Sequence, residues 1–252
     1  EAAGGVGRRA RAGAAKGPWA SQAGGHVMEM QGRHEEGLAW MSRWRPDWTA
    51  GNGFATHLGW HEALFALESL DHIAALRIFD EYMPASRTQI TLERLDAAAL
   101  LWRLRLLGVE LGGRWHDLVA GGDLSESAAG FYAFNDLHAL LALIGAGELG
   151  AAQAWLRVAS ARAEASSGSN REMARDVGAP LMHGMLAVAQ GRFDTAVEHL
   201  YPVRSMAHRF GGTHPHRALH HPTPRAAPAA APAHPAAALP LRPERPPADP
   251  PP

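Results

Sequence analysis

Two histidines stand four residues apart in the stretch HLGWHEALFALE, residues 57–68, and a glutamate follows the second one. At about 100° per residue, His57 and His61 share one stripe of a helix, whereas Glu62 lies roughly 140° round the helix from His57. Two imidazoles on one helix face can bind a metal ion or act as acid–base groups. The order is not the HExxH of zinc peptidases, so a metal site needs a third ligand from elsewhere in the chain.

The nearest candidate for that third group is an acid on the next expected helix, residues 92–108, at about the same distance from the turn that ends its helix. Asp96 lies 12 residues before Gly108, and His57 lies 13 residues before the equivalent turn at Leu70. Helices that pack side by side would therefore bring Asp96 to the histidine pair. Three interpretations remain open: a His–Asp contact that orients packing or caps a groove, a metal site, and an acid–base pair that acts on a substrate.

Four more polar residues join the candidate site. Arg103 lies in the Leu-rich stretch LLWRLRLLG, where we expect it to pair with an acid such as Glu68 or Asp136. The stretch FNDLH places Asn135, Asp136 and His138 at a helix start, where Asn or Asp most often caps the helix. A polar contact in a concave face is the alternative. His138 lies one whole helical unit, about 20 Å, from His61, so we do not expect the two to share an ion.

The elements that must position these residues are helices, because runs of β-branched residues are nearly absent. Apolar helices are expected to end at regular intervals, each followed by a turn and by small residues that begin the next helix. These turns are expected at Gly32, Leu70, Gly108, Gly147 and Gly191. A period near 40 with two helices per unit is typical of an α-solenoid. We therefore predict an all-α fold, an α-solenoid of about five tetratricopeptide-like helix–turn–helix repeats. An irregular helical bundle is the alternative.

Composition divides the chain into three zones. Residues 1–20 are rich in Ala, Gly and Arg and are predicted to be disordered, whereas residues 21–212 hold nearly all the large apolar side chains and form the predicted repeat domain. Residues 213–252 contain 13 prolines together with many Ala and His. Because proline is excluded from helix interiors, this tail is also predicted to be disordered.

Charge and residue content exclude several classes of function. The formal net charge of −1 gives no reason to expect nucleic acid or an anionic membrane as a partner, and no run of 18 apolar residues predicts a membrane span. The chain has no Cys, which removes disulfides, thiolate nucleophiles and cysteine metal sites and fits a cytoplasmic location. No phosphate-binding loop or nucleophile elbow is present, so we expect no cofactor.

Six motifs in order resemble the tetratricopeptide repeat protein 38 family and its bacterial relatives. They are HVMEMQGRHEEGLAWM, HLGWHEALFALE, LDAAALLWRLRLLG, GGRW, FNDLHALLALIGAGE and GMLAVAQGRFDTAVEHL, and they cover about residues 26–212. The resemblance implies an all-helical repeat fold and, since the family has no established enzymatic activity, no mechanism. The residues that match its pattern are His57, Trp60, His61, Asp96, Trp102, Arg103, Arg114, Trp115, Asn135, Asp136 and His138.

The resemblance also raises expectations about the two ends. Relatives would continue with helices before His26 and after RFGGTH, whereas this chain has Arg/Gly/Ala-rich and Pro-rich stretches there. We interpret these ends as the result of a fragment or a shifted reading frame.

The function predicted from all these features is binding of a protein or peptide partner through a concave face, without catalysis. The candidate residues are His57, His61, Asp96, Arg103, Asn135, Asp136 and His138. The alternative is a metal-binding protein or an acid–base enzyme that uses His57, His61 and Asp96. The sequence does not indicate an oligomeric state.

Overall fold

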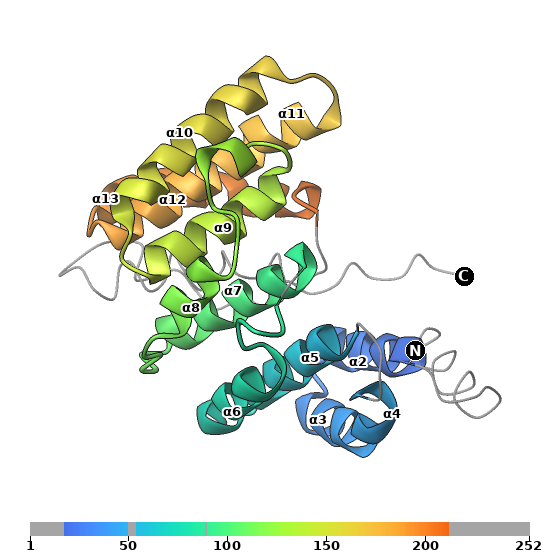
Figure 1. The fold of residues 1–252 in the computed structure, drawn as a ribbon. Helices are drawn as coiled ribbons and strands as arrows, with labels where there is room; N and C mark the ends of the chain where they lie inside the picture. The colour runs from blue at the N-terminus through green and yellow to red at the C-terminus, as the bar shows by residue number, and fades with distance from the viewer. Residues whose placement is uncertain (1–17, 50–53, 89, 212–252) are drawn as a thin grey trace, which may run out of the picture.

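The structure, a computed structural model, describes residues 18–49, 54–88 and 90–211, and within these ranges it contains helices and no strand (Figure 1). The all-α prediction is therefore confirmed. The helices are α2 (Pro18–Met30), α3 (His34–Arg43), α4 (Arg45–Thr49), α5 (Ala55–Glu68), α6 (His72–Tyr82), α7 (Thr91–Leu106), α8 (Arg114–Ala120), α9 (Ala133–Gly145), α10 (Leu149–Ala165), α11 (Ser169–Met173), α12 (Ala179–Ala189) and α13 (Phe193–Val203). Helix α2 begins inside the segment 1–20 that was predicted to be disordered. The rest of that segment and the predicted tail, 213–252, lie outside the described residues.

The same turn closes the first helix of five helix pairs. Gly32, Leu70, Gly108, Gly147 and Gly191 have positive φ angles of 68°, 63°, 75°, 80° and 71°. In each turn, the residue that follows donates its backbone N–H to the carbonyl five positions earlier, at 2.8–3.0 Å. This is the Schellman motif, which satisfies carbonyls that would otherwise remain open at a helix C-terminus. All five turns lie at the residues predicted from the sequence.

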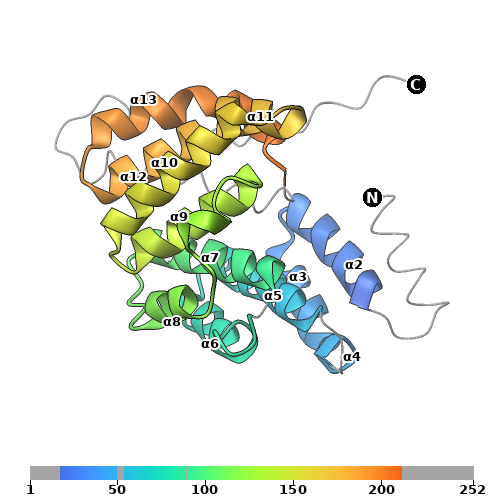
Figure 2. The ribbon, with the colours of Figure 1, turned by 45° about the horizontal axis from the view of Figure 1, so that its top comes forward.

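The first helices of the pairs contact one another in chain order. Helix α2 contacts α5, α5 contacts α7, α7 contacts α9, and α9 contacts α12. Their partners are α3, α6, α8, α10 and α13, and each of the first four partners also contacts the first helix of the following pair (Figure 2). Each pair therefore buries its apolar faces against the next one, and polar residues on neighbouring first helices come within reach of one another.

Close helix approach depends on glycine at several points of this arrangement. A Cβ atom on Gly184 of α12 would clash with Leu200 of α13, and one on Gly37 of α3 would clash with the Phe65 ring of α5. Leu200 is fully buried at the first of these contacts. None of the helices in the described ranges combines the length and apolar character needed to cross a bilayer.

Candidate functional site

The predicted histidine pair lies on α5, a helix that is buried on nearly every side. His57 Nδ1 lies 2.9 Å from Asp96 Oδ2 of α7. The carboxylate can only accept, so this ring nitrogen carries the proton and donates it. Asp96 is fully buried, and His57 and His61 are 6% and 1% exposed. The contact between Asp96 and the histidine pair is thus present as predicted, but it lies between helices.

The third imidazole comes from an element that the sequence reasoning did not consider. His26 of α2 lies with its ring centroid 4.4 Å from that of His61, and His57 lies 4.7 Å from His61 on another side. One ring nitrogen from each of the three histidines lies within 4.8 Å of the other two. The histidine pair therefore has a polar neighbour on each side: the predicted Asp96 from the following first helix, and His26, which was not predicted, from the preceding one.

Helix α2 contributes further polar groups on the same face, at positions i, i+4 and i+7. The Gln22 amide nitrogen lies 3.3 Å from His57 Nε2 and 3.5 Å from His26 Nε2. Glu29 Oε2 lies 3.5 Å from His61 Nδ1 and 3.9 Å from His26 Nδ1. The cluster formed by Gln22, His26, Glu29, His57, His61 and Asp96 is called the histidine cluster below.

Arg103 of α7 lies near the histidine cluster and is half-buried. Burial lowers the pKa of its guanidinium to about 10, and the negative charges of Glu29 and Glu68 oppose that shift. Its Nη1 donates to the Ala99 carbonyl at 3.0 Å. Of the two acids predicted as partners, Glu68 acts on Arg103 through its charge, whereas Asp136 belongs to another part of the fold.

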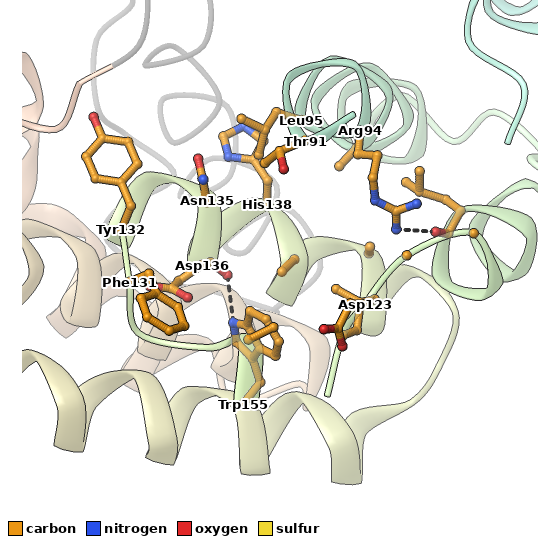
Figure 3. A pocket seen from close by; sticks show the side chains of 18 residues that line it. Thr91, Arg94, Leu95, Asp123, Phe131, Tyr132, Asn135, Asp136, His138 and Trp155 are labelled. Carbon is orange, nitrogen blue, oxygen red and sulfur yellow. Dashed lines mark hydrogen bonds between the residues drawn. The ribbon is translucent and has the colours of Figure 1, made fainter. Parts of the chain in front are cut away.

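The remaining candidates, Asn135, Asp136 and His138, line a separate cavity of about 410 Å³ (Figure 3). Its walls come from α7, the end of α8, the loop of residues 121–132, α9 and Trp155 of α10. The candidates that were expected to share one concave face are therefore divided between the histidine cluster and this cavity, which is called the α7–α9 pocket below.

The sequence predicted that Asn or Asp at the start of α9 caps this helix, but Asp136 does not. Helix α9 has Tyr132 at its N-cap, and Asp136 Oδ1 instead accepts the backbone N–H of Gly130 at 2.8 Å. Burial raises the pKa of Asp136 to about 6, although the hydrogen bond from Gly130 and the charge of Arg162 oppose the shift. His138 Nδ1 donates to the Phe134 carbonyl at 2.8 Å, which fixes this ring in the pocket wall.

Arg94 of α7 is a pocket residue that sequence reasoning missed. Its Nη2 donates to the Leu118 carbonyl at 2.6 Å, and its guanidinium packs against Gly122, where a Cβ atom would clash with it. Its buried Nη1 has no hydrogen-bond partner, and no carboxylate pairs with Arg94, in the part of the chain that the structure describes. Burial lowers the pKa of this guanidinium. In the sequence, the adjacent glycines Gly121 and Gly122 could have indicated this part of the pocket, because paired glycines often mark a place where another group closely approaches the backbone.

Comparison with known proteins adds no identification: no protein-family model matches the chain, and no solved structure matches it.

Proposed function

We propose that this chain is an α-solenoid of tetratricopeptide-like repeats, related to the tetratricopeptide repeat protein 38 family, that binds a peptide segment of a partner protein in the α7–α9 pocket. Two features support the repeat assignment. The five helix pairs share one turn geometry, and their first helices contact one another in series. Stacked helix pairs of this kind form the extended surfaces that helical-repeat proteins use for binding.

Arg94 is the observation that carries the binding proposal. A half-buried cation without an acid partner in the described chain has given up part of its hydration without an ion pair to compensate. Asp123 lines the same pocket but accepts the backbone N–H of Ser125 at 3.0 Å. A carboxylate from a ligand would supply the charge-assisted hydrogen bond that Arg94 lacks.

The rim of the pocket favours a peptide as the source of that carboxylate. Phe131 is 73% exposed and Tyr132 is 39% exposed, and both line the pocket. Exposed aromatic side chains beside a polar pocket are typical of protein recognition surfaces. Asn135 lies in the same wall and offers an amide that can bond to a peptide backbone. The proposed ligand is therefore an extended peptide with an acidic side chain or a free C-terminal carboxylate.

Selection of a random peptide library on the immobilised full-length chain tests this proposal. We expect the selected peptides to share a carboxylate at a fixed position. Their dissociation constants should rise about 10- to 100-fold with Arg94→Gln, because a hydrogen bond to a charged group contributes roughly 1.5–3 kcal/mol. Arg94→Lys should restore part of the affinity, since it keeps the charge and loses the planar fork.

The matched control is Arg157→Gln, which removes a guanidinium from the exposed surface of α10. It should leave the peptide affinity unchanged, and circular dichroism should show that all variants keep their helices. Failure to enrich any peptide, or equal affinity of Arg94→Gln and the wild-type chain, would contradict the proposal.

An acid–base role of His57 and Asp96 on a substrate has less support. Neither residue is among those that line the α7–α9 pocket, and both are buried where α5 and α7 meet. Their position fits a role inside the protein better than contact with a substrate.

A further inference from the structure

Three imidazoles converge in the histidine cluster from two helices that are separate in sequence. His57 and His61 project from one side of α5, and His26 projects from α2, which packs against it. One nitrogen of each ring lies within 4.8 Å of the other two. A zinc ion bound to three histidines has Zn–N distances of about 2.0–2.1 Å, which places the nitrogens roughly 3–3.5 Å apart. Metal binding would therefore require the three rings to rotate toward one another from the observed spacing.

Asp96 holds His57 in the tautomer that can bind a metal through Nε2. Because His57 donates its Nδ1 proton to Asp96 at 2.9 Å, a neutral His57 ring carries its lone pair on Nε2. In protein metal sites, a carboxylate behind the ligating histidine fixes the tautomer and raises the basicity of the ring in this way. His57 Nε2 points to the side of the cluster where Gln22 also approaches His26 Nε2.

The surroundings of the rings favour a cation. Glu29 places a carboxylate oxygen within 4 Å of both His26 and His61, and Asp96 brings a second, fully buried carboxylate. Together with Arg103, which lies near the cluster and interacts with the charge of Glu29, the two acids give a local net charge of −1, which offsets part of the charge of a divalent ion in a poorly solvated place. The His26 side chain is 26% exposed, which gives an ion a route from solvent.

We infer that His26, His57 and His61 bind a divalent transition metal of the zinc class, each through one ring nitrogen, with Asp96 as the positioning residue of His57. Imidazole ligands suit zinc, cobalt and nickel better than calcium or magnesium, which prefer oxygen. Three protein ligands leave a fourth position for water or for Glu29. The histidine cluster shares no residue with the α7–α9 pocket, so this inference is independent of peptide binding.

Titration of the metal-free, full-length chain with Co²⁺ tests the inference. We expect a visible absorption band of four-coordinate cobalt that saturates at one equivalent, and displacement of the cobalt by Zn²⁺. His61→Ala should abolish the band, and His26→Ala provides a second variant at a more exposed position. Asp96→Asn should weaken affinity about 10- to 100-fold while keeping the spectrum, as expected for a residue that acts through a ligand.

Histidines elsewhere in the chain define the controls. The segment 213–252 contains five histidines that can chelate metal without a built site. His183 and His199 stack with ring centroids 5.2 Å apart, but they form no group of three in the described residues. His183→Ala should therefore leave the band and its stoichiometry unchanged. Equal cobalt binding by the wild-type chain, His26→Ala and His61→Ala, or no band in the wild-type chain, would overturn the inference and leave a packing cluster.

Discussion

Replacement of Leu70 by glycine should stabilise the protein. Leu70 is the only residue other than glycine with a positive φ in the described part of the chain, at 63°, and it occupies the turn position that glycine holds in the other four helix pairs. Its side chain is 78% exposed, so little apolar burial is lost when it is removed. The substitution therefore tests the turn geometry almost in isolation.

The expected gain follows from two opposing effects. A residue with a Cβ atom pays roughly 1–2 kcal/mol for the left-handed conformation, and glycine avoids this cost. Glycine also adds about 0.4–1 kcal/mol of conformational entropy to the unfolded chain. The net rise in the free energy of unfolding should be about 0.5–1 kcal/mol, or roughly 1–4 °C in the midpoint of thermal unfolding.

Urea denaturation followed by far-ultraviolet circular dichroism measures this change, with an unchanged slope as evidence that only stability has moved. The matched reverse variant is Gly147→Ala. Gly147 has a φ of 80°, and apart from its two neighbours in the chain no described residue places an atom within 4 Å of an added Cβ. It should lose about 1 kcal/mol through conformation alone. A less stable Leu70→Gly, or a Gly147→Ala without effect, would refute the shared turn geometry.

Three further substitutions test the packing and the electrostatics. Asp136 has a pKa of about 6 in the folded protein and a lower pKa in the unfolded chain, so the stability of the wild type should fall as pH rises from about 4 to about 6. Asp136→Asn should remove this pH dependence and raise the free energy of unfolding at pH 7 by ~1–2 kcal/mol. An unchanged pH profile of the variant would contradict the raised pKa. Gly37→Ala should cost about 1–3 kcal/mol in urea denaturation because its Cβ meets the Phe65 ring, and a neutral result would show that α3 and α5 lie further apart. Arg45→Met should lower the free energy of unfolding by about 2 kcal/mol, because the fully buried Glu62 carboxylate loses the cation to which it is bonded. A thermal midpoint equal to that of the wild type would show that solvent replaces the guanidinium.

The sequence best predicted the features that depend on residue type and spacing along the chain. Glycine at Gly32, Gly108, Gly147 and Gly191 follows apolar helices at a regular spacing, and a left-handed turn needs that residue whatever the tertiary fold. Even Leu70 could be placed, because the spacing of its neighbours requires a turn there. The Asp96 contact followed from the same spacing, since it joins equivalent levels of adjacent first helices.

The sequence was least informative where contacts depend on the angle between helices. His26 lies 6 residues before its turn and His61 lies 9 before its own, so a count from the turns does not align them. Their rings meet because α2 and α5 pack with side chains at different levels facing each other, which the periodicity of either helix alone does not specify. Asp136 likewise bonds to Gly130 because the preceding loop folds back over α9, and no local pattern predicts that path.

Hydrogen–deuterium exchange of the full-length chain, with and without a selected acidic peptide, tests the central claim most directly. Binding in the α7–α9 pocket predicts slower exchange in residues 91–98 and 121–139, with no change in α13. Arg94→Gln should lose this protection at the same peptide concentration. Protection confined to other helices, or the same protection in Arg94→Gln, would contradict the account.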